Sequence, residues 1–234
     1  MIYVHGGGWQ KGDKREVGEK SKFFTELGWV FISINYRLLP EGRHPSNAED
    51  VGNAVVWVHE NIGKYGGAAG QLFLMGHSAG SHLVSLVATD ERYLKKYGKD
   101  LNIIKGVIAL DSSAYDVPAL MKQNKHKFYA SVFEGDLSFQ KDASPLHHVK
   151  MGKGIPPFLI YYSRGIGFRK TPARRKAAIS FQSALKTSRI SAKVVDASDR
   201  NHKEINVRFG EAEDEKVTQK AKVFLLKILE NRAS

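Results

Sequence analysis

The 234-residue chain contains no cysteine. This absence excludes disulfide bonds, metal sites with thiolate ligands and a cysteine nucleophile. Long apolar runs are missing too, since no stretch approaches the ~20 consecutive apolar residues that a membrane-spanning helix needs. The first residues also lack the basic segment and apolar run of a signal peptide. We therefore expect a soluble, cytoplasmic protein with no membrane partner.

Acidic residues are absent from one long part of the chain. Between Ala143 and Val195 there is no Asp or Glu, whereas eleven Lys and Arg residues lie there, and the formal net charge of the whole chain is +12. A basic excess of this size is one signal of nucleic-acid binding. However, the basic residues lack regularly interleaved aromatics, and no nucleic-acid-binding motif is present. We expect no nucleic-acid partner.

The remaining pattern favours an α/β fold. Short apolar runs alternate with longer helical patterns, which is typical of strand–helix–strand units on a parallel sheet. Helices are expected from a cap at Ser46 to near Gly66, from Ser78 through Val87, from Pro172 through Leu185, and from Val217 through Leu229. With 42% hydrophobic residues, residues 1–234 are predicted to form a single domain. The predicted strands are Ile2–Val4, Val30–Asn35, Leu72–Met75, Ile103–Leu110, Pro157–Tyr162 and Ala192–Val195.

Residues 111–151 do not show the alternating strand and helix patterns of the rest of the chain, because they mix proline, glycine and aromatic residues without sustained periodicity. We interpret this segment as a cap-like excursion over the C-terminal edge of the sheet. Ligands of open α/β sheets bind outside the carboxyl ends of the strands. The excursion is therefore expected to shape a substrate pocket.

The strongest chemical signal is Gly76-His77-Ser78-Ala79-Gly80, a G-x-S-x-G sequence that follows an apolar strand and opens a helix. A sharp turn from strand to helix exposes the serine hydroxyl, and small flanking residues tolerate the strain. The backbone N–H of Ala79, at the start of the helix, is then placed to stabilise an oxyanion. An incidental serine in a structural glycine turn is the alternative interpretation.

A second signal, His5-Gly6-Gly7-Gly8-Trp9, follows another predicted strand. Glycines let the backbone approach a substrate closely and direct N–H groups at a developing negative charge. We expect His5 to brace this loop rather than to act as a base. The two motifs together, in this order along the chain, favour a serine hydrolase.

The two motifs together resemble the α/β-hydrolase esterases, in particular the carboxylesterase and kynurenine-formamidase-like group. Three further stretches are similar to segments of that family: Asn35-Tyr36-Arg37-Leu38 with Pro45 and Asp50, Ala143-Ser144-Pro145-Leu146, and Asn201-His202-Lys203-Glu204-Ile205-Asn206. The resemblance implies an α/β-hydrolase fold, with a mostly parallel sheet and helices on both faces. It also implies Ser78 as nucleophile, His202 as base, and Gly7, Gly8 and Ala79 as oxyanion-hole donors.

His202 is also the histidine best placed along the chain. It alone among nine histidines lies after the last predicted strand and before the terminal helix, which is the order that this fold uses. The other histidines are expected to be structural. His147-His148 lacks carboxylates or cysteines at ligand spacing, so no metal is expected. The mechanism requires no cofactor.

The chain departs from the family in two ways. First, Met1 stands almost at the H-G-G-G strand, so the one or two strands that usually precede it are absent from this sequence, either in a minimal domain or in a truncated reading frame. Ile2–Val4 would then be an uncovered edge strand, which favours a homo-oligomer. Second, residues 163–170, where the family's triad acid normally lies, contain no carboxylate.

A replacement acid has to come from another strand end. Asp111 is best placed, directly after the predicted strand Ile103–Leu110, and Asp116 is next. Asp196 and Asp199 lie on the histidine's own loop, while Asp142 is assigned to the Ala143–Leu146 turn. These alternatives stay open at this point, and a loop-start or helix-capping role for Asp111 stays open with them.

The sequence therefore predicts an esterase that cleaves small carboxylic esters through an acyl-enzyme intermediate. An arylformamidase-type amide hydrolase is a narrower alternative. If Arg164 and Arg169 flank the pocket, an anionic ester is a further option. The rival from another class is a degenerate hydrolase that binds without turnover, suggested by the missing acid, the missing strands and the basic stretch between Ala143 and Val195.

Overall fold

The computed structural model describes residues 1–123, 127–166 and 172–230. Its centre is a six-stranded sheet in the order β2-β1-β3-β4-β5-β6, with every neighbouring pair parallel. All six predicted strands are confirmed, with small shifts at their ends. They are β1 (Ile2–Val4), β2 (Ile32–Ile34), β3 (Leu72–His77), β4 (Ile104–Leu110), β5 (Phe158–Ser163) and β6 (Ala192–Ala197).

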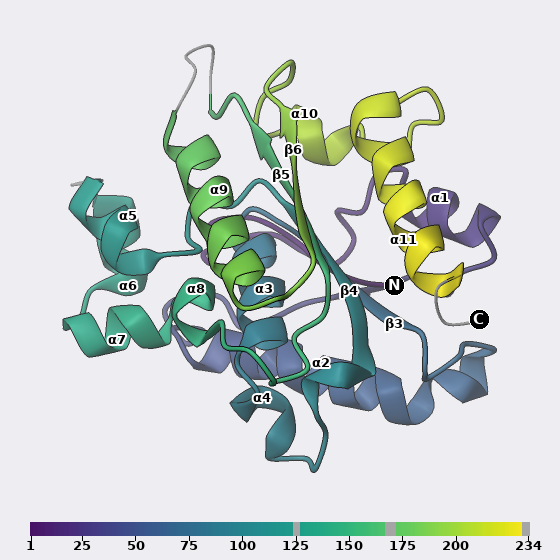
Figure 1. Ribbon diagram of the computed structural model, residues 1–234, viewed down its shortest axis with the longest axis horizontal. Coiled ribbons are helices and arrows are strands. Elements are labelled where there is room, and N and C mark those ends of the chain that lie inside the picture. Colours follow the sequence, from purple (N-terminus) through teal and green to yellow (C-terminus); the bar gives the residue numbers. More distant parts are fainter. Residues whose placement is uncertain (124–126, 167–171, 231–234) are drawn as a thin grey trace.

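Helices cover both faces of the sheet (Figure 1). One face carries α2 (Ser46–Asn61), α3 (Ala79–Thr89) and α9 (Pro172–Thr187). The opposite face carries α1 (Lys20–Glu26) and α11 (Lys220–Glu230). Strand side chains alternate between two apolar cores, as their period of two requires. In β1, Ile2 and Val4 belong to the first core and Tyr3 to the second.

The four predicted long helices are present, but their starts differ in detail. Ser46 is the first residue of α2 rather than its cap, because Pro45 occupies the capping position and no side chain caps the helix. The C-terminal helix begins with a wider turn over Glu215–Gln219, capped by the side chain of Asp214. Outside the segment between β4 and β5, the structure also contains three short α-helices that were not predicted: α1, α4 (Arg92–Lys95) and α10 (Glu204–Val207).

The prediction that β1 is an edge strand is wrong. β1 lies inside the sheet and pairs with both β2 and β3. The chain leaves β1, passes through α1 on one face and returns as β2 on the outer side. The edge strand on this side of the sheet is therefore β2, which is only three residues long and partly buried. A homo-oligomer stays a prediction, but an uncovered β1 no longer supports it.

The segment between β4 and β5 contains four short helices, drawn beside α9 in Figure 1. They are α5 (Val117–Gln123), α6 (Lys127–Phe133), α7 (Leu137–Asp142) and α8 (Pro145–His148). Helices of seven residues or fewer give too little periodicity to be seen in a sequence. Over the described ranges, no helix has the length and apolarity that crossing a bilayer requires.

Candidate active site

Ser78 stands in a sharp turn between β3 and α3. Its backbone adopts φ 55° and ψ −115°, a conformation that is strained for a residue with a side chain. A Cβ on Gly76 would clash with the carbonyl group of Gly80, and one on Gly80 would clash with the carbonyl oxygen of Val4. Only glycine therefore lets the turn close this tightly. The Ser78 hydroxyl is held at the carboxyl edge of the sheet, at the N-terminus of α3.

The structure brings three of the predicted site residues together. His202 Nε2 lies 2.9 Å from Ser78 Oγ, and His202 Nδ1 lies 2.6 Å from Asp111 Oδ2. A carboxylate only accepts hydrogen bonds, so Nδ1 carries the proton and Nε2 is free to accept from the serine. Asp111 follows β4, the strand next to β5, and is fully buried. This chain of hydrogen bonds has the geometry of a Ser-His-Asp triad.

The other carboxylates considered from the sequence are engaged elsewhere. Asp116 accepts from a backbone N–H at the start of α5, and Asp142 bonds His44 on the loop before α2. Asp196 accepts from the backbone two residues further on, and Asp199 forms ion pairs within the C-terminal segment. In the described parts of the chain, Asp111 is the carboxylate that is hydrogen-bonded to the His202 ring.

Asp111 remains ionised although it is buried. Burial raises the pKa of a carboxyl group, but three neighbours oppose this effect. The hydrogen bond from His202, the positive charge of Arg174 and the hydrogen bond from Ser163 together hold the pKa of Asp111 well below its usual range. The carboxylate is therefore negative throughout the neutral range, as an acid that orients an imidazole must be.

The glycine loop lies against the serine. A Cβ on Gly6 would come within 3.2 Å of Ser78 Cβ, so the backbone of the loop itself approaches Ser78. Gly7 and Gly8 have φ of 114° and 64°, which glycine adopts without strain. Among the described residues, neither of their backbone N–H groups has a recorded acceptor. Like Ala79 in the first turn of α3, they are free to donate to a bound oxyanion.

Aromatic residues brace this loop, as expected for His5. The His5 ring stacks on Tyr36 at 4.6 Å, and its Nδ1 lies 2.7 Å from the carbonyl oxygen of Gly6. Further along, Trp9 Nε1 donates to His82 Nδ1, and His82 Nε2 donates to Ala143 O. Burial lowers the pKa of His82 to about 4, so it stays neutral in this relay. The glycine loop is thereby tied to the Ala143–Leu146 turn.

His77 is a site residue that the sequence did not single out. It occupies the variable position before Ser78, and its Nε2 donates to the backbone oxygen of His202 at 2.8 Å. Burial, reinforced by the charge of His202, holds the pKa of His77 well below its usual value. Neutral His77 thus anchors the loop that carries His202. The backbone N–H of His202 also donates to Gly165 O at 2.9 Å.

A buried lysine supports the same loop from the other side. Lys20, on α1, is fully buried, and its Nζ donates to the backbone oxygen of Asn206 at 2.5 Å. The Asn206 side chain accepts from the Tyr3 hydroxyl at 2.9 Å. Asn206 belongs to α10, which begins two residues after His202. The sequence gave no sign that Lys20 supports this loop, because α1 itself was not predicted.

Lys20 makes the stability of the fold depend on pH. Burial lowers its pKa from 10.5 to about 7, so between these values the unfolded chain binds more protons than the folded one. Stability therefore rises with pH across this window. Relative to Lys20→Met, we expect the wild-type free energy of unfolding to gain on the order of 2 kcal/mol between pH 7 and 9. Urea unfolding at several pH values measures this difference.

The matched control is Lys22→Met, which removes an exposed lysine from the same helix. Its free energy of unfolding should follow that of the wild type at every pH. Parallel pH profiles for wild type and Lys20→Met would contradict the assignment.

The candidate triad opens into a cavity of about 800 Å³. The glycine loop, Ser78 and His202 lie on its wall. Phe128 and Tyr129 of α6 line it as well, so the segment between β4 and β5 contributes to the pocket. This volume lies in the range of small-molecule sites. Over the described ranges, no cluster of three or more His, Cys, Asp or Glu side chains that would hold a metal ion is found.

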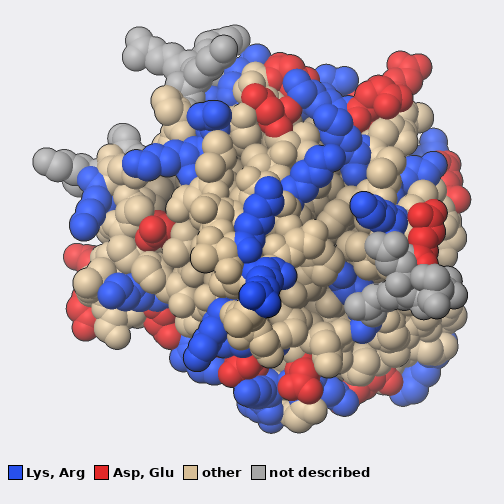
Figure 2. All heavy atoms as spheres, in the orientation of Figure 1, with Lys and Arg blue, Asp and Glu red and all other residues tan. Residues whose placement is uncertain are grey.

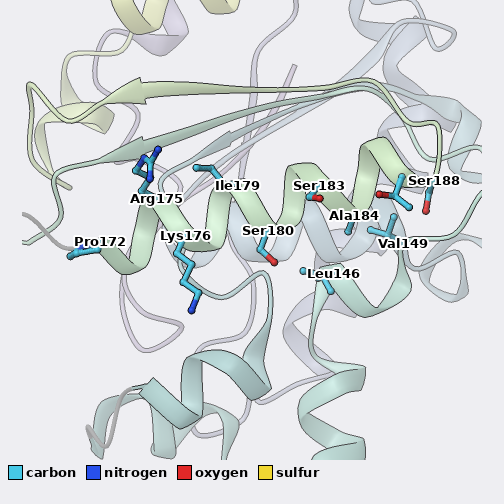
Figure 3. A pocket seen from close by; sticks show the side chains of 11 residues that line it. Leu146, Val149, Pro172, Arg175, Lys176, Ile179, Ser180, Ser183, Ala184 and Ser188 are labelled. Carbon is cyan, nitrogen blue, oxygen red and sulfur yellow. The ribbon is translucent and has the colours of Figure 1, made fainter.

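A second hollow of about 870 Å³ runs along α9 and includes neither Ser78 nor His202. Figure 3 shows its lining, with Arg175 and Lys176 near the start of the helix and small hydroxyl residues further along. On the face drawn in Figure 2, Lys and Arg cross the middle of the molecule, and most Asp and Glu lie towards the margins. Arg175 and Lys176, which line the hollow, belong to the stretch between Ala143 and Val195 that lacks acidic residues.

The predicted flanking of the pocket by two arginines has a mixed outcome. Arg164 is not among the residues that line the cavity, and its guanidinium lies 3.5 Å from Glu204. Arg169 lies outside the described residues. Arg174 does line the cavity, but its guanidinium is directed at Asp111. The structure therefore gives the anionic-ester option no support from Arg164.

Comparison with solved structures shows the fold. Esterase B from Lactobacillus rhamnosis superposes with a TM-score of 0.78 at 18% identity, covering 99% of this chain and 77% of that one. Esterase 2 from Thermogutta terrifontis superposes with a TM-score of 0.73 at 21% identity, covering 97% and 82%. The predicted α/β-hydrolase fold is confirmed.

Sequence comparison points the same way. The chain is 28% identical over 177 residues to LipM of Mycobacterium tuberculosis, called a probable carboxylic ester hydrolase, covering 70% of this chain and 40% of that protein. It is 30% identical over 169 residues to arylacetamide deacetylase of Bos taurus, covering 64% and 42%. The chain thus spans about two fifths of the length of these relatives. The family model named BD-FAE matches residues 1–164, and the chain belongs to the BD-FAE family.

Proposed function

We propose that this protein is a serine esterase that hydrolyses small carboxylic esters. The observation that carries the proposal is the hydrogen-bonded chain from Ser78 through His202 to Asp111, which opens into the 800 Å³ cavity. The names of relatives such as LipM and arylacetamide deacetylase agree with acyl chemistry. Localisation in the cytoplasm is part of the same proposal.

In the first half of the reaction, Ser78 Oγ attacks the ester carbonyl carbon while His202 Nε2 accepts the hydroxyl proton. The carbonyl oxygen gains the negative charge of a tetrahedral intermediate. The backbone N–H groups of Gly7, Gly8 and Ala79 stabilise that charge. His202 then returns its proton to the leaving alkoxide, the C–O bond breaks, and the acyl group remains on Ser78.

In the second half, a water molecule replaces the alcohol. His202 takes a proton from the water as the hydroxide attacks the acyl carbon, and the same three N–H groups stabilise the second oxyanion. Collapse of this intermediate releases the carboxylic acid and returns the proton to Ser78 Oγ. Asp111 stays ionised throughout and stabilises the imidazolium that forms in each half.

The proposed substrates are esters with short acyl chains or aryl leaving groups. The cavity walls carry Trp9, Phe128 and Ile166, which suit an apolar group of modest size. Arylformamides remain the narrower alternative, because the same acyl transfer applies to an activated amide. No nucleic acid, membrane or metal takes part in any step.

The test is pre-steady-state hydrolysis of p-nitrophenyl acetate and butyrate. We expect a burst of about one p-nitrophenol per chain if deacylation limits turnover, since an acyl-enzyme then accumulates. A fluorophosphonate probe should label Ser78, as located by peptide mass spectrometry. Binding of the ester without turnover, or labelling at another serine, would contradict the proposal. Preferred cleavage of a formanilide would select the amide alternative.

A further inference from the structure

Asp111 is held by two residues that have no place in a minimal triad. Its Oδ1 accepts from the backbone N–H of Ser163 at 2.9 Å, and its Oδ2 accepts from the Ser163 hydroxyl. Arg174 Nη1 donates to the backbone oxygen of Asp111 at 2.6 Å and lies 3.3 Å from Oδ2. Both carboxylate oxygens are therefore occupied, and one guanidinium nitrogen contacts the main chain and the side chain together.

We propose that Ser163 and Arg174 are positioning residues that hold Asp111 in the orientation in which it accepts from His202. This inference rests on the proposed function and goes beyond it, because neither residue touches Ser78 or a substrate's reacting atoms.

The hydroxyl of Ser163 has only one orientation that satisfies all its contacts. Its oxygen accepts from the backbone N–H of Gly165 at 3.0 Å, so its single proton is directed to Asp111 Oδ2. Ser163 ends β5, the strand after which the acid was expected from family resemblance. The end of β5 therefore carries the hydroxyl of Ser163, which donates to the carboxylate of Asp111 at the end of the neighbouring strand, β4.

Arg174 supplies charge as well as geometry. Its side chain is 9% exposed and that of Asp111 is 0% exposed, so the pair is shielded from water and from salt. Asp111 adopts φ 57°, a strained conformation for a residue with a side chain, which neighbours must maintain. The contact of Arg174 with the backbone oxygen of Asp111 is suited to this task. An ionised carboxylate this deeply buried also requires a partner of opposite charge.

Arg174→Gln tests the inference, with Arg175→Gln as the matched control. Arg175 is the next residue of α9, is exposed, and lines the hollow along α9 instead of the cavity at Ser78 (Figure 3). In Arg174→Gln we expect kcat for p-nitrophenyl acetate to fall by roughly 10- to 100-fold, because misplaced catalytic groups cost about this much. In Arg175→Gln we expect wild-type kcat.

The pH profile of kcat/KM measures the electrostatic part of the contact between Arg174 and Asp111. Without the guanidinium, the charge of Asp111 is no longer balanced, and it stabilises the imidazolium more strongly. The acidic limb of the kcat/KM profile should therefore move to higher pH by roughly one unit. Arg174→Lys, which restores the charge without the fork, should return the limb towards its wild-type position.

A spectroscopic readout separates this inference from the proposed function. The Nδ1–H proton that His202 shares with Asp111 should give a far-downfield NMR resonance, which His202→Gln removes. We expect this resonance to shift upfield or broaden in Arg174→Gln and in Ser163→Ala, even if no ester is turned over. If Arg174→Gln fails to fold, Ser163→Ala, which removes a single hydroxyl, carries the same test. An unchanged resonance in both variants would overturn the inference.

Discussion

Ser78→Ala should lower kcat for p-nitrophenyl esters by roughly 10⁴- to 10⁶-fold, the range seen when a triad nucleophile is removed. The fold should survive, because alanine adopts the same backbone conformation at a similar cost and the flanking glycines are untouched. Residual activity, if measurable, would come from the N–H groups of the glycine loop. Steady-state kinetics with protein purified from an esterase-free host measures the effect.

The matched control for this substitution is Ser183→Ala, which removes an exposed hydroxyl from α9. Its rate should equal the wild-type rate. Comparable turnover by Ser78→Ala and wild type would remove Ser78 as the nucleophile. It would point to hydrolysis by another group or to a contaminating enzyme.

Asp111→Asn should lower kcat by roughly 10⁴-fold, as the equivalent change does in a serine protease triad. An amide N–H₂ facing His202 favours the tautomer with its proton on Nε2, which cannot accept from Ser78. Arg174 also loses its charge partner, so the melting temperature should fall as well. Kinetics are therefore measured well below the melting temperature, together with far-UV circular dichroism.

Asp199→Asn is the control for this prediction. Asp199 lies on the same loop as His202, but its carboxylate forms ion pairs with Arg200 and Lys216. Near-wild-type activity is expected for this variant. A near-wild-type rate for Asp111→Asn, or a larger loss for Asp199→Asn, would transfer the acid role away from Asp111.

Much of the fold could be predicted because its signals are local. Each strand is a short apolar run, and the periodicity of α2, α3 and α9 is long enough to be recognised. The turn around Ser78 is also local, since the glycines and the serine lie within five residues. The positive φ of Ser78 then follows from the strand-to-helix connection.

Other features could not be predicted because they depend on the order of the strands in the sheet and on how the helices pack against it. A sequence does not show that the chain returns from α1 to the outer side of β1, so β1 was mistaken for an edge strand. Nor does it show that Lys20 is buried beneath the loop that carries His202. The sequence predicts that residues 111–151 help to shape the pocket, but it does not show that α6 forms part of the pocket wall.

The residues of the candidate site also fall into two groups, those with a local signal in the sequence and those that depend on the order of the strands. Ser78, His202 and the glycine loop can be singled out from motifs and chain order, because each is marked by residues that lie close together in the sequence. In the sequence Asp111 is one of several candidate acids, and the hydrogen bond to His202 that favours it forms because the parallel strands bring the ends of β4 and β5 beside His202. Ser163 and Arg174 gave no signal in the sequence, since their roles arise from contacts across 52 and 63 residues. Contacts over such separations depend on how the strands are ordered, which only the folded sheet establishes.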